Sequence, residues 1–164
     1  MKKTGIFYGS TTGTTAGIAR RIARVLGVSN DDIHDVAVTA PSVLGEYELD
    51  IIGSSTWNNG DVQPDFYDFL DGAQALDLRG HRIAIFGCGD ESMSDSFNSA
   101  IGDIYKKLRD TGAVFVGEFN ADGYDFDDSA AEINGHIVGL MLDEVNHADL
   151  TDSRIAAWVK TLKA

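Results

Sequence analysis

Short apolar runs alternate with segments of helical periodicity along almost the whole chain. The runs that we interpret as buried strands are residues 5–8, 33–38, 49–53, 83–86 and 113–116. The segments between and after them place apolar residues three or four positions apart, which is typical of amphipathic helices. Because strands and helices alternate with short connections, the pattern predicts an α/β fold with a doubly wound parallel sheet and helices on both faces.

Three helices stand out by their apolar faces. The first carries Ile18, Ile22, Val25 and Leu26 on one side, with Arg20, Arg21 and Arg24 on the other. The second carries Phe97, Ile101, Ile104, Tyr105 and Leu108. We expect the last to begin near Thr151 as its N-cap and to bury Ile155, Trp158, Val159 and Leu162.

The length and the strand count suggest one domain over residues 1–164. A five-stranded parallel sheet of this size suits the strand order 2-1-3-4-5, in which ligands bind beyond the carboxyl ends of the strands. The loops after the first, third and fourth strands are therefore the candidate ligand loops. Residues 120–146 are acidic, irregular and rich in Gly and Asn, so we expect an insertion after or within the fifth strand.

The loop after the first strand has the composition of a phosphate site. It contains Ser10, Thr11, Thr12, Gly13, Thr14 and Thr15. Main-chain amides at the start of a helix favour an anion. A Walker loop is excluded because Thr14 stands where the lysine is needed, and G-x-G-x-x-G is excluded by the glycine spacing. A terminal phosphate held without a cation suits a mononucleotide, although a plain helix-capping turn is the simpler alternative.

Trp57 follows the third strand in a polar, flexible stretch that includes Asn58, Asn59 and Gly60. A core tryptophan usually lies within a periodic apolar pattern, as Trp158 does. Trp57 lacks such neighbours in the sequence. We therefore expect Trp57 to be a stacking platform for a flat ring, and Trp158 to belong to the core.

The charge balance limits the possible partners. The formal net charge is -13, which opposes binding to nucleic acid and to anionic membranes. The same charge attracts basic protein surfaces. Cys88 is the only cysteine, so no intramolecular disulfide can form. The first residues lack the apolar region of a signal peptide and no run is long enough to cross a bilayer, so we expect a cytoplasmic protein. We also expect a monomer.

With these residues in hand, the chain resembles the flavodoxins. The run from Ser10 to Thr15 matches their phosphate motif, [ST]-x-T-G-x-T. Further matching segments are Ser55-Thr56-Trp57-Asn58, Gly87-Cys88-Gly89-Asp90 and Asp122-Gly123-Tyr124-Asp125-Phe126. The irregular stretch and the segment Asp149-Leu150-Thr151-Asp152 look like the long-chain branch of the family.

The resemblance implies a flavodoxin-like fold that binds flavin mononucleotide (FMN) non-covalently and serves as a low-potential one-electron carrier. It implies a cofactor site made of the three loops, comprising Ser10, Thr11, Thr12, Gly13, Thr14, Thr15, Ser55, Thr56, Trp57, Asn58, Asn59, Gly60, Cys88, Gly89, Asp90, Met93, Asp95, Ser96 and Asn98. It also implies that the Asn58-Asn59 peptide reorients to accept a hydrogen bond from the protonated flavin N5 of the neutral semiquinone.

Met93 marks a departure from the family pattern. Most flavodoxins place a tyrosine against the outer face of the flavin, and Met93 is the best match to that position. Methionine covers less area, so we expect weaker FMN binding and a modified oxidised/semiquinone potential. Plain loop packing is the alternative role for Met93. Cys88 is expected to be a small buried residue that touches the flavin through its backbone, with no partner base for a catalytic thiol.

Acidic residues cluster around the candidate loops, namely Asp61, Asp65, Asp68, Asp90, Glu91 and Asp95. Negative charge near a flavin disfavours the addition of an electron, which makes the semiquinone/hydroquinone couple strongly reducing. A solvated acidic face is the simpler explanation for such residues.

An NAD(P)H-dependent quinone or FMN reductase of the same fold is the alternative function. The sequence contains no nucleotide-recognition motif, and its histidines, His34, His81, His136 and His147, are scattered. We therefore expect an electron-transfer protein and not an enzyme. Its partners would be larger oxidoreductases with basic docking surfaces, such as reductases and iron-sulfur enzymes.

Overall fold

A computed structural model describes residues 1–163 and contains a central, mainly parallel sheet. The strands run in the order β2-β1-β3-β5-β6. Their bounds are Lys2–Gly9 for β1, Ile33–Asp35 for β2, Tyr47–Trp57 for β3, Arg82–Cys88 for β5 and Val114–Val116 for β6. In chain order these are the five strands predicted from the sequence, so the α/β fold and the order 2-1-3-4-5 are confirmed. The short β4 (Asp61–Val62) adds an antiparallel pair at the end of β3.

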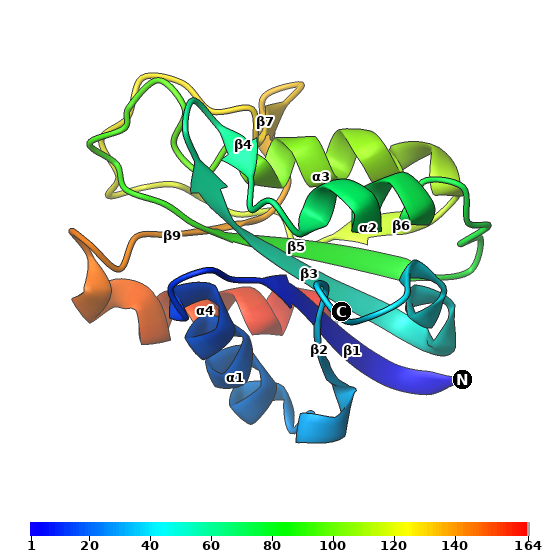
Figure 1. Cartoon of the computed structure of the whole chain (residues 1–164). Coiled ribbons are helices and arrows are strands. Elements are labelled where there is room, and N and C mark those ends of the chain that lie inside the picture. The colour runs from blue at the N-terminus through cyan, green and yellow to red at the C-terminus, as the bar shows by residue number, and fades with distance from the viewer. Residues whose placement is uncertain (164) are drawn as a thin grey trace.

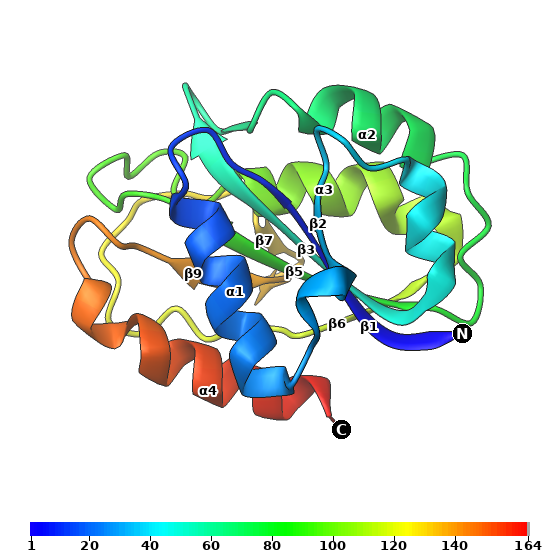
Figure 2. The ribbon, with the colours of Figure 1, turned by 60° about the horizontal axis from the view of Figure 1, so that its bottom comes forward.

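Helices cover both faces of the sheet. Helices α2 (Phe66–Ala73) and α3 (Ala100–Leu108) lie on one face, and α1 (Thr14–Leu26) and α4 (Thr151–Leu162) lie on the other (Figure 1). Figure 2 shows α1 and α4 next to each other on the face of the sheet that is turned toward the viewer. Short 3-10 turns fill the connections, at Asn30–Asp32, Pro41–Glu46, Arg109–Thr111 and Ala148–Leu150. Within residues 1–163, no helix is both long and apolar enough to cross a bilayer.

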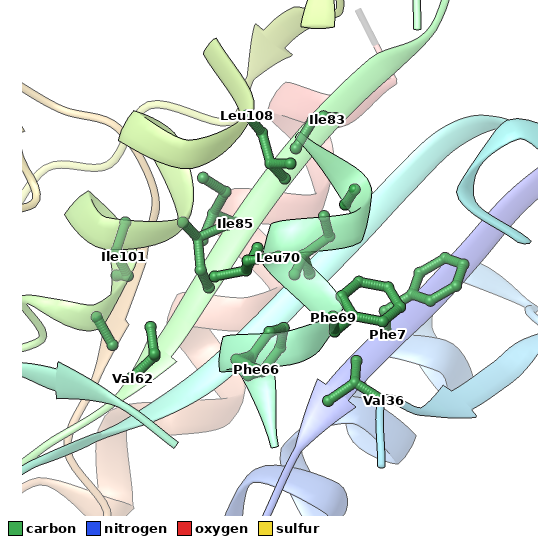
Figure 3. Packing of buried hydrophobic residues seen from close by; sticks show 14 of the residues in the cluster. Phe7, Val36, Val62, Phe66, Phe69, Leu70, Ile83, Ile85, Ile101 and Leu108 are labelled. Carbon is green, nitrogen blue, oxygen red and sulfur yellow. The ribbon is translucent and has the colours of Figure 1, made fainter. Parts of the chain in front are cut away.

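The sheet separates two apolar layers because its central strands are buried on both faces. On the α2–α3 face, Phe66 and Leu70 of α2 pack with Ile85 of β5 in one buried cluster (Figure 3). On the α1–α4 face, Ile22 and Trp158 belong to the second cluster. Trp158 is 2% exposed and its indole donates a hydrogen bond to the Gly117 carbonyl at 2.8 Å, so its expected place in the core is confirmed.

The fifth strand is interrupted by the inserted segment, residues 117–139. Strand β6 pairs with the first half of β5, and β9 (Leu140–Leu142) pairs with the second half in the same parallel direction. The insertion contains the hairpin of β7 (Glu132–Ile133) and β8 (His136–Ile137). The insertion was expected after or within the fifth strand, and the structure shows that it lies within it. The chain leaves the edge of the sheet after β6 and returns to it at β9.

Several local expectations are corrected. Val25 is 48% exposed, because α1 turns this position away from the sheet. Thr151 is the first residue of α4, and its N-cap position is held by Leu150 without a side-chain cap. The strand expected over residues 33–38 ends at Asp35, whose carboxylate accepts a hydrogen bond from the Ala37 amide at 2.9 Å and so starts a turn.

Helix α2 was not predicted, although its apolar residues have helical spacing. Phe66, Phe69, Leu70 and Ala73 are all buried and fall at positions i, i+3, i+4 and i+7. The helix is short and contains Gly72, where a Cβ atom would lie 2.7 Å from the Pro41 side chain. Close packing against that turn therefore explains a glycine that weakens the helical pattern.

Candidate functional site

A cavity of about 520 Å³ opens at the carboxyl ends of β1, β3 and β5. The loops that follow these strands gather at the left of Figure 1. The cavity is lined by Thr12, Thr14, Ser55, Thr56, Trp57, Asn58, Cys88, Gly89, Asp90, Met93, Ser96, Phe97, Asn98, Glu144 and Val145. All three loops expected from the strand order therefore contribute to one site.

The structure brings most of the expected site residues to this cavity, and adds three. Expected residues that do not line it are Ser10, Thr11, Gly13, Thr15, Asn59, Gly60 and Asp95. The additions are Phe97, Glu144 and Val145. Glu144 and Val145 arrive through β9, which pairs with β5 beside the cavity. The apolar run at residues 140–142, followed by polar residues, was the sequence signal for this return.

The loop after β1 leaves main-chain amides free at the start of α1. Gly13 is the N-cap with φ of 92°, and the first helical bond runs from the Gly17 amide to the Gly13 carbonyl at 2.9 Å. The amides of Thr14, Thr15 and Ala16 precede that bond and have no helical acceptor. The first turn contains no acidic residue. These amides and the helix dipole therefore create a site for an anion.

The hydroxyl groups of this loop have different surroundings. Ser10 Oγ accepts a hydrogen bond from the Gly13 amide at 3.1 Å and so shapes the turn. Thr11 Oγ1 accepts one from Gln63 Nε2 at 3.1 Å. The side chain of Thr15 is buried, and its Oγ1 has no hydrogen-bond partner among the described residues. Thr12 and Thr14 line the cavity.

Trp57 is the last residue of β3, is partly exposed at the cavity and is held by contacts with its neighbours in the chain. Its indole Nε1 donates a hydrogen bond to Ser55 Oγ at 2.8 Å. The Trp57 carbonyl accepts a hydrogen bond from the Gly60 amide at 3.1 Å, which closes a turn. Asn58 has φ of 49° and Gly60 has φ of 106°, as the Asn-Asn-Gly sequence led us to expect. The indole is thus fixed in orientation without being buried in the core.

The loops after β3 and β5 pack directly on each other. A Cβ atom at Gly60 would lie 3.0 Å from the Ser99 Cβ atom, so a glycine allows this close approach. Thr56 Oγ1 accepts a hydrogen bond from the Ala100 amide at 3.2 Å. The end of β3, which carries Trp57, and the loop that carries Met93 are therefore held against each other.

Asn98 presents a buried acceptor beside the cavity. Its side chain is 0% exposed, and its Nδ2 group donates a hydrogen bond to the Leu142 carbonyl at 3.2 Å. Its Oδ1 atom has no hydrogen-bond partner among residues 1–163. A buried acceptor without a donor is costly, so this atom fits a ligand that brings an N–H group.

The loop after β5 is ordered by Asp90. Its Oδ1 atom accepts hydrogen bonds from the Ser92 hydroxyl at 2.7 Å, the Ser92 amide at 2.9 Å and Asn146 Nδ2 at 2.8 Å. These donors, the Ser92 hydroxyl first, hold the pKa of Asp90 below its ordinary value. The Met93 amide donates to the Asp90 carbonyl at 2.9 Å, and the Met93 side chain remains 53% exposed.

Cys88 is a buried thiol at the floor of the cavity. Burial raises its pKa to about 12, so the sulfur stays protonated at neutral pH. A protonated thiol is a poor nucleophile. The structure thus agrees with the expectation of a small buried residue. Among the histidines, His147 contacts the loop after β5, with its Nε2 atom 2.7 Å from Glu91 Oε1.

Comparison with known proteins places this geometry in a family. The flavodoxin family model matches residues 6–158. This chain belongs to the flavodoxin family. A flavodoxin from Nostoc sp. is 42% identical over 164 residues, covering 99% of this chain and 96% of that protein. Flavodoxin 1 of Escherichia coli is 38% identical, covering 99% and 93%.

Solved structures agree with the family assignment. A Fusobacterium nucleatum flavodoxin bound to flavin mononucleotide is 30% identical, with a TM-score of 0.90, and the match covers 99% of this chain and 98% of that one. Flavodoxin 1 from Bacillus cereus has a TM-score of 0.70 at 23% identity, which shows the shared fold. The reported relatives are named flavodoxins, so the reductase alternative is not favoured.

Proposed function

We propose that this flavodoxin is a low-potential one-electron carrier that binds FMN non-covalently. FMN supplies, when bound, a ring that gains and loses electrons one at a time. The proposal rests on one observation, which is that two different binding features border the same cavity. A cation-free anion site at the start of α1 and the partly exposed indole of Trp57 border one cavity. A phosphate joined to a flat aromatic ring satisfies both.

The residues of the first loop fit a terminal phosphate. The free amides of Thr14, Thr15 and Ala16 supply donors, and the hydroxyls of Thr12 and Thr14 add more at the cavity. A Cβ atom at Gly13 would meet nothing within 4 Å, so the positive φ of this residue, and not crowding, is what favours a glycine at the N-cap.

The other loops fit the ring. Trp57 offers an aromatic face, and Met93 offers a polarisable side chain at the rim of the same cavity. The Oδ1 atom of Asn98 is a buried acceptor for a ring N–H group. We therefore assign the cofactor site to all the residues expected from the sequence, with the peptide between Asn58 and Asn59 as the acceptor for the flavin N5 hydrogen. Phe97, Glu144 and Val145 join them.

The charge of the protein supports a reducing couple and basic partners. The chain has a net charge of -13, and the cavity is lined by Asp90 and by Glu144, whose carboxylate is ion-paired with Arg21. Negative charge beside the ring opposes the addition of an electron. The same charge favours brief, salt-sensitive complexes with basic surfaces of reductases and iron-sulfur enzymes. We propose that residues 1–164 act as one domain, as a cytoplasmic monomer without catalytic activity of its own.

The test is a stepwise reductive titration of the FMN-loaded protein, followed by its absorption spectrum. A one-electron carrier gives two separated transitions. A single two-electron bleaching, or rapid unaided oxidation of NADPH, contradicts the proposal and favours a reductase. If the purified chain gains no yellow cofactor on addition of FMN, the cofactor assignment itself is wrong.

A further inference from the structure

We propose that Glu91 is a positioning residue that fastens the Met93 loop to the inserted part of the chain and so sets the affinity for the flavin ring. The inference rests on the proposed function, because it concerns the same cavity. Glu91 does not line the cavity, whereas its neighbours Asp90 and Met93 do. It therefore acts through the loop and not by contact with the cofactor.

Glu91 connects segments that are distant in the sequence. Its Oε2 atom accepts a hydrogen bond from the Asp125 amide at 2.9 Å, within the inserted segment. Its Oε1 atom lies 2.7 Å from His147 Nε2, just before α4. A carboxylate only accepts, so the His147 nitrogen is the donor. These donors, the Asp125 amide first, hold the pKa of Glu91 below its ordinary value.

The main chain of Glu91 is fixed by a second carboxylate. The Glu91 amide donates to Asp143 Oδ2 at 3.0 Å. Asp143 is 0% exposed and also accepts from the amides of Val145 and Asn146 and from the Asn146 side chain, each at 2.9 Å. Asp143 thus joins the turn that carries Val145 to the loop that carries Met93. Both segments line the same cavity.

Ser94 makes further contacts between this loop and the inserted segment. Ser94 Oγ donates to the exposed Asp127 carboxylate at 3.1 Å, and the Ser94 carbonyl accepts from the amides of Asp127 and Asp128, both at 2.9 Å. The loop has no helix or strand of its own from residue 89 to residue 99. Its position therefore depends on such contacts, and the Glu91 carboxylate provides two of them, one to each of two distant segments.

We do not propose a metal site in this network. Glu91, Asp143 and His147 lie close enough to share an ion. However, each oxygen of Asp143 and of Glu91 already accepts hydrogen bonds from the protein. A network with its donors and acceptors paired stabilises loop geometry without an added cation.

The test compares Glu91→Ala and Glu91→Gln with Glu132→Ala. Glu132 is an exposed residue of the inserted segment that contains Asp125. Its replacement by Ala changes the net charge by the same amount as Glu91→Ala does. Apoprotein of each variant is titrated with FMN and with riboflavin, which lacks the phosphate. We expect Glu91→Ala to weaken the binding of both ligands by the same factor, about tenfold or more, because charge-assisted hydrogen bonds are lost. Glu132→Ala should bind both as the parent chain does.

Glu91→Gln tests whether a side chain of the same shape restores part of the affinity, which a general folding defect would not explain. Its amide oxygen can replace one of the two acceptors, so its loss of affinity should lie between those of the parent and of Glu91→Ala. Equal affinity of Glu91→Ala and Glu132→Ala for riboflavin would overturn the positioning role. A loss confined to FMN would also overturn it, because that pattern belongs to the phosphate site. Failure of the parent chain to bind FMN would instead refute the proposed function.

Discussion

The indole nitrogen of Trp57 and the hydroxyl of Ser55 are joined by a 2.8 Å hydrogen bond across the end of β3. The bond lies between two residues of one strand that both line the cavity. It satisfies the only polar atom of the indole, so the ring keeps its orientation when a ligand arrives. Ser55 thereby reduces the ordering that Trp57 must undergo on binding.

Substitution of this pair should show coupling. We expect Trp57→Ala to weaken FMN binding by about ten- to a hundredfold, which is the usual range for loss of an aromatic stacking partner. Ser55→Ala should cost about fivefold in affinity, corresponding to one hydrogen bond. In the Trp57→Ala background Ser55→Ala should add little. Quenching of flavin fluorescence measures each affinity, and additive losses would contradict an anchoring role.

A negative charge at the start of α1 should weaken the binding of the FMN phosphate without affecting the binding of the flavin ring. Thr12→Asp puts a carboxylate beside the amides proposed to hold the phosphate, so FMN affinity should fall by about tenfold or more. Riboflavin affinity should hardly change. Ser42→Asp, at an exposed position of the turn Pro41–Glu46, is the matched control for added charge. Equal losses for both ligands would place the phosphate elsewhere.

Met93→Tyr should strengthen the complex. Tyrosine offers a larger flat surface than methionine at the rim of the cavity, and we expect about a three- to tenfold gain in FMN affinity. Met93→Ala should change the affinity in the opposite direction. Isothermal titration of the apoprotein measures both. If neither substitution alters the affinity, Met93 serves only in loop packing.

Asp50 should make the stability of the fold depend on pH. It is 0% exposed in the middle of β3, neither carboxylate oxygen has a partner among the described residues, and burial raises its pKa to about 8. The folded state thus retains a proton that the unfolded state loses near pH 4. The free energy of unfolding should fall as pH rises between these values, with a slope of up to about 1.4 kcal/mol per pH unit.

Asp50→Asn removes the ionisation while keeping the shape of the side chain. Its advantage in stability over the parent chain should grow from pH 5 to pH 8 in urea unfolding curves. Asp31→Asn removes an exposed carboxylate and serves as the comparison. A constant difference between Asp50→Asn and the parent at every pH would refute the assignment.

The sheet could be predicted from the sequence because its strands are continuous apolar runs. The runs around Ile51 and Ile85 are buried on both faces, which a short hydrophobic stretch indicates directly. Helix α2 was not predicted because it has only eight residues, follows an acidic loop and includes Gly72. The pattern at Phe66 and Phe69 is helical, but a segment this short gives a weak periodic signal.

The candidate site could be predicted where its residues follow a strand directly. Trp57 and the threonines before α1 are examples, since the strand order fixes where these loops end. Glu144 and Val145 could not be found in this way, because their place depends on the return of the chain to β5 after the insertion. The partnership of Glu91 with Asp125 and His147 depends on the same return. Contacts that span an irregular insertion produce no regular spacing of residues from which they could be predicted.

The interruption of the fifth strand also affects whether other chains can pair with the edges of the sheet. Strand β6 covers β5 at residues 82–84 and β9 covers it at residues 86–88, so the outer margin of the sheet is made of two separate three-residue pieces. The opposite margin, β2, is equally short. Neither offers a long row of unpaired amides and carbonyls on which a foreign strand could grow. Short edge strands of this kind disfavour edge-to-edge pairing between copies of the chain.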